Sequence, residues 1–440
     1  MKCLIIAAGQ GSRLRHRGSS KPLIPVLGVP LIERVIRTVV RAGIRDFCVV
    51  TGYNGRKVRD FLDGLARRLG INVTHVVNDE WDRGNGLSVL KAREHLEGES
   101  FFLLMSDHLF DWEVLCDMER HPPKDGEVTL AVDLDTSNPL VDMDDATKVE
   151  CRDGLVRSIG KDLREYNGFD TGIFLCTPAL FDAIERSAGE GGDTSLTGGI
   201  RLLAAEGRVN AFDTGRRFWI DVDDGDALDR AEEALSERLR GKATDGPVSR
   251  LLNRPLSVRL SRRLARTGIT PNQISFASFV LSLVAAWLFT RQGYLPLAAG
   301  AVLAQAASVI DGSDGEVARL RFLESDYGGW FDAVLDRYAD ALLLFGLTWH
   351  AFLKSAEGLT LFVGFMAIIG SFMLSYTADK YDNLMRSRFE GRGGLRMGRD
   401  VRVFLIFVGG LLNQPFLTLL VIAVLMNIET VRRMVVCRHA

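Results

Sequence analysis

The sequence predicts an α/β Rossmann-like domain followed by an all-α domain of six transmembrane helices. Residues 1 to about 235 alternate short, β-rich apolar runs with segments of helical periodicity. Six apolar stretches follow one another after residue 273. No acidic residue occurs from Gly246 to Ile310, whereas arginines crowd the first third of that segment. At 440 residues the chain is long enough for each domain to have its own core.

The N-terminal half has the pattern of βαβ units. Predicted strands, bounded by Gly, Asp or Asn, are Lys2–Ala7, Phe47–Thr51, Val73–Val77 and Phe101–Met105. Predicted helices are Leu31–Ala42, Lys57–Arg68 and the charged segment Ala227–Lys242. This alternation predicts a mostly parallel sheet with helices on both faces. Ligands of such folds bind beyond the carboxyl ends of the strands.

The C-terminal half contains apolar stretches suited to a bilayer. They are Ile274–Thr290, Tyr294–Ile310, Phe331–Leu353, Leu359–Ala378, Val403–Leu412 and Phe416–Ile428. Several reach the roughly 20 residues that cross a membrane, and the shorter ones can do so with flanking polar turns. The fifth is interrupted by Gly409, Gly410 and Asn413. A buried helix of a soluble domain would explain one stretch, but six in succession with basic connectors favour a membrane.

Arginine clusters predict the orientation in the membrane. They precede the first stretch, separate the fourth from the fifth and follow the sixth: Arg250, Arg254, Arg259, Arg262, Arg263 and Arg266; Arg386, Arg388, Arg392, Arg396, Arg399 and Arg402; Arg432, Arg433 and Arg438. The positive-inside rule places all three on the cytosolic side, in agreement with an even number of spans. We therefore expect a multi-pass protein of the cell (inner) membrane with a cytosolic N-terminal domain and C-terminus.

The domain boundaries follow from these changes in composition. We predict a cytosolic domain over residues 1–242, a linker and juxtamembrane helix over residues 243–266, and a membrane domain over residues 267–440. Ser249–Arg266 is basic with interspersed leucines, which is typical of an amphipathic helix on a membrane surface. The chain starts directly with a strand-like run, so we expect no signal peptide. The six scattered cysteines, without a C-x-x-C pair, indicate free thiols in a reducing compartment.

The most informative stretch runs from Asp311 to Asp336. It reads D-G-S-D-G-E-V-A-R, then eight residues, then G-G-W-F-D-A-V-L-D. Asp311 and Asp314 share one helical face, and Asp332 and Asp336, four residues apart, share a second. A short polar turn joins the two helices, so we expect them to pack antiparallel with their four carboxylates at one depth.

Four converging carboxylates predict a site for one or two hard divalent ions, Mg²⁺ or Mn²⁺. Placing a charged carboxylate in or near a bilayer is energetically unfavourable, so carboxylates found there usually have a function. Two such metals suit phosphoryl transfer. Gly315 and Ala318 leave room for a nucleotide, and Arg319 can bind a phosphate. Helix caps or interfacial aspartates would explain one or two of these residues, but not both helical spacings together.

The pattern D-x-x-D-G-x-x-A-R-x8-G-x3-D-x3-D is similar to the signature of the CDP-alcohol phosphotransferase family at every position. The resemblance covers about Leu251–Arg433, including the segment Thr270–Ser275 before the first span. It implies transfer of an alcohol phosphate from a CDP-alcohol to an acceptor hydroxyl, with release of CMP. By this resemblance Asp311, Asp314 and Asp332 would hold metal, and Asp336 would join them and act as general base. Gly315 and Ala318 would accommodate cytidine, and Arg319 a phosphate.

A glycine-rich loop follows the first strand. It reads A-G-Q-G-S-R-L over Ala8–Leu14, and S-K-P-L follows at Ser20–Leu23. Gly9 and Gly11 let the backbone approach phosphates, while Arg13 and Lys21 supply charge for a triphosphate. A dinucleotide fingerprint would need a third glycine where Leu14 stands, and a P-loop would need G-K-[ST].

The loop resembles that of the nucleotidyltransferase family that activates sugars and phospho-alcohols, over about Met1–Leu235. The implied reaction is attack of a substrate phosphate on the α-phosphorus of an NTP, with release of pyrophosphate. The implied roles are nucleotide binding by Gly9, Gly11, Ser12, Asn85 and Gly86, catalysis by Arg13 and Lys21, metal binding by Asp107, Asp221 and Asp223, and substrate binding near Lys161 and Asp170. Strand-end turns are the alternative explanation for the acidic residues taken singly.

The fusion of the two halves identifies the nucleotide. A membrane half that consumes CDP-alcohols makes CTP the sensible substrate of the soluble half. The combination resembles bifunctional enzymes that make CDP-inositol from CTP and inositol 1-phosphate and transfer phosphoinositol to a second inositol 1-phosphate. The segment Arg386–Arg402 fits a phosphorylated acceptor and equally fits anionic lipid head groups. The resemblance also implies a homodimer through the membrane domain, and no nucleic-acid partner is expected.

Two other functions remain open from the residues alone. A phospholipid synthase would use diacylglycerol as acceptor or a CDP-linked lipid as donor. An ion-coupled transporter would use the membrane aspartates as an ion site and the N-terminal domain as a nucleotide sensor. The fixed spacing of Gly315, Ala318 and Arg319 favours phosphotransfer over transport.

Overall fold

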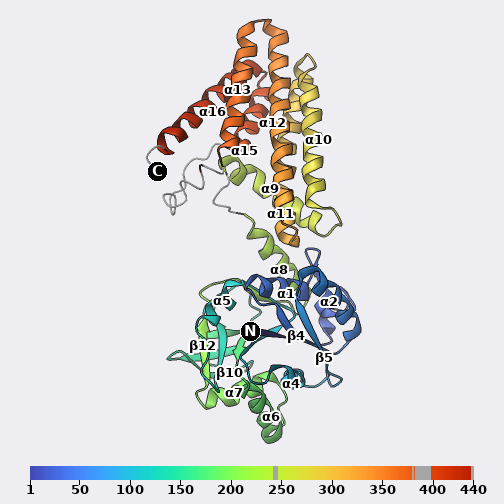
Figure 1. Cartoon of the computed structure of the whole chain (residues 1–440), viewed down its shortest axis with the longest axis vertical. Helices are drawn as coiled ribbons and strands as arrows, with labels where there is room; N and C mark the ends of the chain where they lie inside the picture. The colour runs from blue at the N-terminus through green and yellow to red at the C-terminus, as the bar shows by residue number, and fades with distance from the viewer. Residues whose placement is uncertain (241–245, 379–380, 382–397, 438–440) are drawn as a thin grey trace. The chain divides into compact units, whose positions relative to one another are not determined.

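The computed structural model describes residues 1–240, 246–378, 381 and 398–437 (Figure 1). The chain divides into two compact units, Met1–Glu233 and Ala234–Ala440. Residues 243–245 of the predicted linker and the arginines Arg386, Arg388, Arg392, Arg396 and Arg438 of the predicted basic clusters lie outside the described residues. All six cysteines are free, as predicted, and Cys3, Cys48 and Cys176 are buried.

A nine-stranded sheet forms the centre of the first unit within the described residues. Its order is β5-β4-β1-β6-β11-β8-β12-β10-β9. The strands are β1 (Lys2–Ala7), β4 (Asp46–Thr51), β5 (Asn72–Val77), β6 (Phe101–Met105), β8 (Val128–Asp133), β9 (Lys148–Arg152), β10 (Leu155–Gly160), β11 (Gly168–Cys176) and β12 (Val209–Asp213). Two small pairs stand apart: β2 (Pro25–Val26) with β3 (Val29–Pro30), and β7 (His108–Phe110) with β13 (Trp219–Asp221).

The prediction of a mostly parallel sheet is wrong, because the sheet is mixed. β5, β4, β1 and β6 are parallel, as their intervening helices require. β11 is antiparallel to both β6 and β8, and β10 is antiparallel to β12 and β9. No helix intervenes between β8 and β11 along the described chain. The intervening segment forms the antiparallel pair β9 and β10 instead of a crossover helix, and β11 then lies antiparallel to β8.

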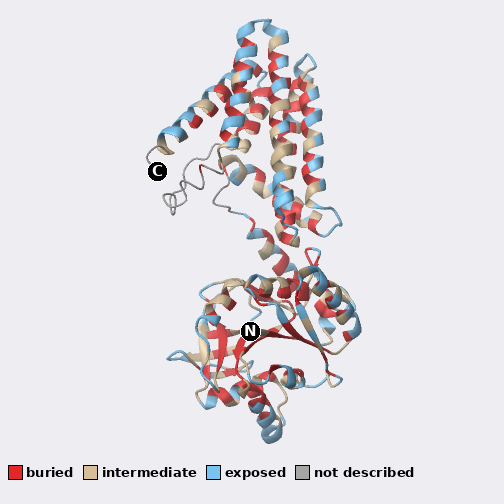
Figure 2. Ribbon diagram, in the orientation of Figure 1, coloured by how far each residue is buried: buried red, intermediate tan, exposed pale blue. Residues whose placement is uncertain are grey.

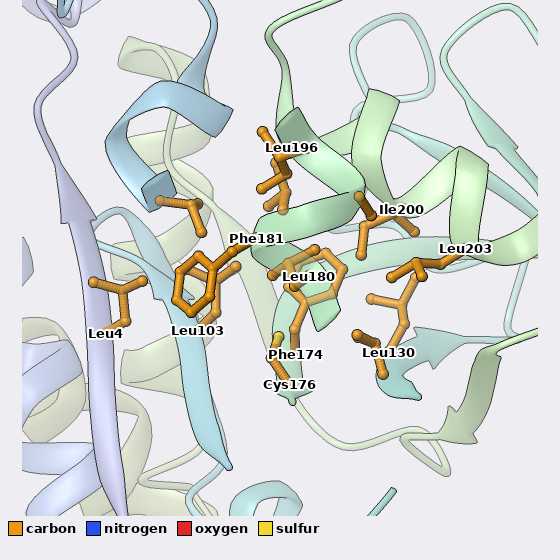
Figure 3. Packing of buried hydrophobic residues seen from close by; sticks show 14 of the residues in the cluster. Leu4, Leu103, Leu130, Phe174, Cys176, Leu180, Phe181, Leu196, Ile200 and Leu203 are labelled. Carbon is orange, nitrogen blue, oxygen red and sulfur yellow. The ribbon is translucent and has the colours of Figure 1, made fainter. Parts of the chain in front are cut away.

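Helices cover both faces of the sheet, as predicted. They are α1 (Leu31–Arg41), α2 (Gly55–Leu69), α3 (Asn85–Lys91), α4 (Arg93–Leu96), α5 (Glu113–Glu119), α6 (Ala179–Gly191) and α7 (Leu196–Ala205). Alternate residues of β1 face opposite sides, and Leu4 packs with Leu103 beneath Phe181 of α6 (Figure 3). Burial of each such side chain contributes about 1.5–3 kcal/mol. This hydrophobic core fixes the positions of the strands whose ends carry the candidate site residues.

The second unit is all-helical. After α8 (Gly225–Glu237), which spans the boundary between the units, come the π-helical turn η3 (Ser249–Asn253), α9 (Arg254–Ala265), α10 (Pro271–Phe289), α11 (Tyr294–Arg321), α12 (Asp326–Ser355), α13 (Gly358–Tyr376), α15 (Arg399–Leu411) and α16 (Pro415–Cys437). Each predicted apolar stretch lies mainly on one helix from α10 to α16. Thr270 and Gln273 form a capping box at the start of α10, and Pro271 occupies its first turn.

The packing of α11 and α12 differs from the expectation. The four residues 322–325 connect them, so the helices run in opposite directions as predicted. They scarcely contact each other along their length, because α10 packs against both of them. The aspartates of α11 and α12 therefore approach one another although the two helices are not closely packed.

Three of the described helices, α10, α11 and α13, are long and apolar enough to cross a membrane. Large apolar side chains of α10 and α13 are exposed, among them Phe276, Trp287, Phe362 and Phe365. Figure 2 shows exposed residues along the helices of this unit. α12 and α16 are longer than a span but carry several charges, and α15 has only 13 residues. The predicted count of six spans stays a prediction.

Candidate active sites

The first site lies where strands of the N-terminal unit end. Asp107 follows β6, and Asp223 follows β13. β7 and β13 pair so that Asp221 stands opposite His108. This short ladder joins segments that are far apart in the sequence. The structure therefore brings together the three carboxylates that were predicted to bind metal.

Lys21 lies between these carboxylates. Its Nζ is 2.5 Å from Asp107 Oδ2 and also donates to Asp223 Oδ1. Burial alone would lower the pKa of Lys21, but Asp107, Asp223 and Asp221 outweigh burial and raise its pKa above the ordinary range. Burial alone would raise the pKa of Asp107, yet Lys21 and His108 hold it well below the ordinary range. Lys21 is thus a fixed positive charge beside the ionised carboxylate of Asp107.

His108 belongs to the same cluster and was missed from the sequence. Its Nδ1 is 2.9 Å from Asp107 Oδ1 and 3.6 Å from Asp221 Oδ1. Burial opposes its protonation, but Asp221 and Asp107 raise its pKa to about 9. Burial raises the pKa of Asp221 to about 7, against the effect of His108. The signal available in the sequence was the D-H pair directly after a buried strand.

The glycine-rich loop borders this cluster. Gly11 has a φ of 60°, and a Cβ at this position would collide with the side chain of Lys21. A Cβ at Gly9 would meet nothing within 4 Å, which leaves open space beside the backbone. Ser12 is exposed at the start of the short 3-10 helix η1 (Ser12–Leu14). The loop therefore offers an accessible backbone next to Lys21.

Asp145 joins two of the predicted binding residues and was also missed. Its carboxylate oxygens are each 2.5 Å from a basic group, Arg13 Nη1 and Lys161 Nζ. Arg13 also lies 3.7 Å from Asp223 Oδ2. Hydrogen bonds from Arg13 and Lys161 hold the pKa of Asp145 well below the ordinary range. Asp145 thus brings these two cations together, although they lie far apart in the sequence.

A cavity of about 250 Å³ opens beside these groups. It is lined by predicted site residues, Asn85, Asp107, Lys161, Asp170, Asp221 and Asp223, and by others that include His108, Asp145 and Trp219. Asn85 is partly engaged, because its Oδ1 accepts the backbone N–H of Leu196 at 2.8 Å. Gly86 does not line the cavity and lies against the backbone of Thr194. Burial raises the pKa of Asp170 to about 6, opposed by the N–H of Gly172.

The second site lies between helices of the C-terminal unit. Asp311, Asp332 and Asp336 offer carboxylate oxygens that all lie within 4.8 Å of one another. Asp314 lies one turn along α11 from Asp311, on the same face. Three of the four predicted metal-binding carboxylates therefore converge directly, and the fourth adjoins them.

Serines of α10 hold two of these carboxylates. Ser275 Oγ donates to Asp314 Oδ2 at 2.5 Å, and Ser278 Oγ donates to Asp311 Oδ1 at 2.9 Å. Both serines are buried. They were missed as site residues, although the series Ser275, Ser278 and Ser282 at helical spacing in an apolar helix was a usable signal.

Arg399 of α15 completes the cluster. Its Nη1 lies 2.5 Å from Asp311 Oδ2 and 2.7 Å from Asp336 Oδ1. Its Nε lies 3.2 Å from Asp340 Oδ1, and Arg402 Nη2 donates to Asp340 Oδ2 at 2.5 Å. From the sequence these arginines were predicted only as part of a basic connector, and Asp340 was missed. The continued spacing of four from Asp332 through Asp336 to Asp340 was the available signal.

The small residues of the signature lie beside the carboxylates. Ala318 is buried one turn beyond Asp314. A Cβ at Gly315 would meet only Arg319 Nη1, at 3.3 Å, so the side of α11 at Gly315 is open apart from that flexible side chain. Arg319 is half-buried. The helix therefore has open space at Gly315, next to the face that carries Asp311 and Asp314.

Both acidic clusters fit a divalent cation. Asp221 Oδ1 in the first and Asp332 Oδ1 in the second are buried without a hydrogen-bond partner among the described residues. Buried carboxylate oxygens normally find partners, and hard divalent ions prefer such oxygen ligands. Basic side chains, Lys21 and His108 in the first cluster and Arg399 in the second, neutralise part of the negative charge.

The chain matches two family models, a MobA-like NTP transferase domain over residues 3–200 and a CDP-alcohol phosphatidyltransferase over residues 268–436. The second match and the three apolar helices indicate association with a membrane. The solved structure of the inositol-1-phosphate CTP transferase from T. maritima is 27% identical, with a TM-score of 0.48, and the match covers 55% of this chain and 96% of that one.

Full-length relatives combine the same two halves. The chain is 38% identical over 441 residues to the bifunctional IPC transferase and DIPP synthase of Rubrobacter xylanophilus, covering 99% of this chain and 96% of that protein. It is 31% identical over 436 residues to the protein of the same name from Aquifex aeolicus, covering 97% of this chain and 96% of that protein. The chain belongs to the family of bifunctional IPC transferases and DIPP synthases.

Proposed function

We propose that the chain makes a CDP-alcohol and then consumes it. CTP and inositol 1-phosphate react in the first half to give CDP-inositol and pyrophosphate. The second half transfers phosphoinositol to an acceptor alcohol, a second inositol 1-phosphate, and releases CMP. The observation that carries this proposal is the full-length similarity to bifunctional relatives, together with one acidic site of matching chemistry in each half.

In the soluble half, the residues divide into two groups by charge. Asp107, Asp221 and Asp223 would hold Mg²⁺ or Mn²⁺, which supplies charge neutralisation of the triphosphate when bound. Lys21 is positioned to stabilise charge on the phosphates as pyrophosphate leaves. Arg13 extends this positive surface toward the cavity. No covalent enzyme intermediate is needed, since the substrate phosphate is itself the nucleophile.

The other residues of the soluble half would bind substrate. Gly9, Gly11 and Ser12 supply accessible backbone for the nucleotide phosphates, and Asn85 with Gly86 supplies the base-recognition turn. Lys161 lies in the cavity wall where it can bind the phosphate of the alcohol. Asp170, in the same wall, can accept hydrogen bonds from hydroxyl groups.

In the membrane half, Asp311, Asp314, Asp332 and Asp336 would hold the divalent ions, which neutralise the pyrophosphate linkage of the CDP-alcohol when bound. Asp336 would also take the proton of the acceptor hydroxyl as that oxygen attacks the phosphorus of the alcohol phosphate. CMP departs as the phosphate–phosphate bond breaks. Gly315 and Ala318 make room for cytidine, and Arg319 binds a phosphate.

The placement in the membrane extends the same proposal. The C-terminal unit would cross the inner membrane six times, with the N-terminal unit and the C-terminus in the cytosol. The proposed boundaries are residues 1–242, 243–266 and 267–440, and the assembly is a homodimer through the membrane domain. The exposed apolar faces of α10 and α13 support contact with lipid.

The first prediction separates the two reactions within one chain. With CTP, Mg²⁺ and inositol 1-phosphate, the native protein should release both pyrophosphate and CMP. Asp332→Asn and Asp336→Asn should each reduce CMP release at least about a hundredfold, because a metal-binding charge is lost, and leave pyrophosphate release unchanged. Release of CMP by both variants at the native rate would contradict the assignment of the membrane site.

The acceptor is identified in the same assay. A phosphorylated di-inositol product stays in the aqueous phase, whereas a lipid product partitions into organic solvent. We expect labelled inositol in a new aqueous product without added lipid. Dependence of CMP release on diacylglycerol would instead establish a phospholipid synthase, and uptake of an ion without CMP release would establish a transporter.

A further inference from the structure

Helix α11 carries a second polar side that the catalytic signature does not use. Asp311 and Asp314 face the metal site, while Gly312 and Glu316, four residues apart, lie on the side toward α9. Glu316 is an x position of the signature, so the family pattern assigns it no role. It is 0% exposed.

Both carboxylate oxygens of Glu316 accept hydrogen bonds from residues of α9. Arg254 Nη1 donates to Glu316 Oε1 at 2.5 Å, and Ser257 Oγ donates to the same oxygen at 2.7 Å. Ser261 Oγ donates to Glu316 Oε2 at 2.7 Å. A buried ion pair is weak evidence for stability, because desolvation offsets its attraction. The pair does fix the position of α9 relative to α11, because a buried carboxylate must keep all of its hydrogen-bond donors in place.

The same face of α9 contacts the backbone between the two metal-binding aspartates. Ser313 Oγ donates to the carbonyl oxygen of Ser257 at 3.4 Å, and Ser261 Oγ lies 3.3 Å from the carbonyl oxygen of Ser313. A Cβ added to Gly312 would lie 3.6 Å from Ser257 Oγ, which shows how closely α9 approaches this turn. α9 therefore supports the segment from Asp311 to Asp314 directly.

Polar contacts continue along the same line toward the start of α9. Gln305 Nε2 donates to Asn253 Oδ1 at 2.8 Å, and Asn253 Nδ2 donates to Ser308 Oγ at 3.2 Å. On the other side of α11, Ser275 and Ser278 of α10 hold the carboxylates themselves. The metal-binding turn is thus held on its ligand side by α10 and on its opposite side by α9.

We propose that Glu316 and Arg254 are positioning residues for the membrane metal site. Their pairing fixes α9 against α11 and thereby sets the orientation of Asp311 and Asp314. The proposal rests on the proposed function of the membrane half. Groups that orient metal ligands from outside the ligand set typically change metal affinity 10–100-fold when they are removed.

The test compares metal affinity in the full-length protein, purified in detergent. Glu316→Gln keeps the shape of the side chain and removes its charge. We expect the Mg²⁺ concentration for half-maximal CMP release from preformed CDP-inositol to rise about tenfold, with most of the rate restored by excess Mg²⁺. Ser257→Ala with Ser261→Ala should shift it in the same direction. Arg254→Lys should retain a higher affinity for Mg²⁺ than Arg254→Met, because lysine keeps the positive charge.

Two controls separate positioning from damage to the fold. Arg259→Gln, on the exposed side of α9, should leave the Mg²⁺ midpoint unchanged. Pyrophosphate release from the soluble half should stay the same in every variant. A lower maximal rate with an unchanged Mg²⁺ midpoint would overturn the proposal, because a merely structural role lowers the amount of active enzyme without changing metal affinity.

A direct binding measurement keeps this test independent of the reaction. The protein is titrated with Mn²⁺, and electron paramagnetic resonance distinguishes free from bound ion. The site in the soluble half adds the same amount of binding to the native protein and to the variant. Weaker Mn²⁺ binding by Glu316→Gln is the expected result, and equal binding would refute positioning. If the native protein released no CMP, the proposed function would fail, and the Mn²⁺ titration would still decide the role of Glu316.

Discussion

Lys21 and Arg399 have the same electrostatic relation to their sites in two unrelated folds. Each basic group contacts two carboxylates from different elements, Asp107 and Asp223 for Lys21, Asp311 and Asp336 for Arg399. Like charges at such separations repel strongly when buried, so a nearby cation is required when no metal is bound. The same cations then lie where phosphate groups would approach the carboxylate-bound ions.

At the residue scale, Lys21→Met tests the soluble site. The variant removes the charge positioned to stabilise the departing pyrophosphate, so pyrophosphate release should fall about a hundredfold. CMP release from preformed CDP-inositol should be unaffected. Lys124→Met, at an exposed position outside the cavity, is the matched control and should match the native protein in both assays. Unchanged pyrophosphate release by Lys21→Met would remove Lys21 from the mechanism.

Asp170 predicts a dependence of stability on pH. Burial raises its pKa from 3.8 to about 6 in the folded protein, so the folded state binds more protons than the unfolded state between these values. Stability from this group is therefore lost as the pH rises from about 3.8 to about 6. Asp170→Asn cannot ionise and should melt at a higher temperature than the native protein at pH 8, with a smaller difference at pH 5. A lower melting temperature at pH 8 would show that the carboxylate is stabilised.

Site residues that belong to a sequence motif were predicted better than the residues that contact them from other parts of the fold. Asp107, Lys21 and the aspartates of α11 and α12 were found because their spacing along the chain is itself the signal. His108, Asp145, Ser278 and Arg399 were missed, since each contacts a site residue far away in the sequence: Asp221 for His108, Arg13 for Asp145, and Asp311 for both Ser278 and Arg399. No local pattern specifies which carboxylate such a residue will meet.

At the scale of helices and strands, local periodicity was sufficient to predict where a strand lies in the sequence, but not which strands pair or in which direction. β1 and β6 begin and end at the predicted residues, because buried strands end sharply at polar turns. The direction of β11 was not predictable, since a buried strand has the same composition in either orientation. The segment Ser249–Arg266 was predicted to be an amphipathic surface helix, and α9 indeed has an exposed basic side. Its other side carries serines that bind α11, which a hydrophobicity pattern does not reveal.

Close packing of α10 against α12 gives a prediction at this scale. A Cβ at Gly346 would lie 2.6 Å from the carbonyl oxygen of Ala286 and 3.1 Å from Phe289 Cβ. Small residues permit such close approach of helices in membranes. Gly346→Ala should therefore lower the melting temperature of the C-terminal unit in detergent and reduce CMP release, while pyrophosphate release persists. Gly358→Ala, where a Cβ meets nothing within 4 Å, should change neither, and equal effects of both variants would exclude the packing explanation.

At the scale of the whole molecule, the fold class was predicted correctly. The change in composition near residue 246 separates a nucleotidyltransferase fold from a helical membrane unit, and both family matches agree with it. The number of spans could not be fixed in the same way. α12 combines four Asp residues and an Arg with an apolar second half, so hydropathy alone does not decide whether it crosses the bilayer.

The central claim is that one chain contains two separate active sites linked by a CDP-alcohol. The most direct measurement mixes equal amounts of Lys21→Met and Asp336→Asn proteins with CTP, Mg²⁺ and inositol 1-phosphate. Each variant alone should release CMP at no more than about a hundredth of the native rate, because one of the two steps is blocked in each. The mixture should release CMP at a substantial fraction of the native rate, since CDP-inositol made by one protein can be consumed by the other. Failure of the mixture to release CMP, with pyrophosphate still produced by Asp336→Asn, would contradict a diffusible CDP-alcohol linking two independent sites.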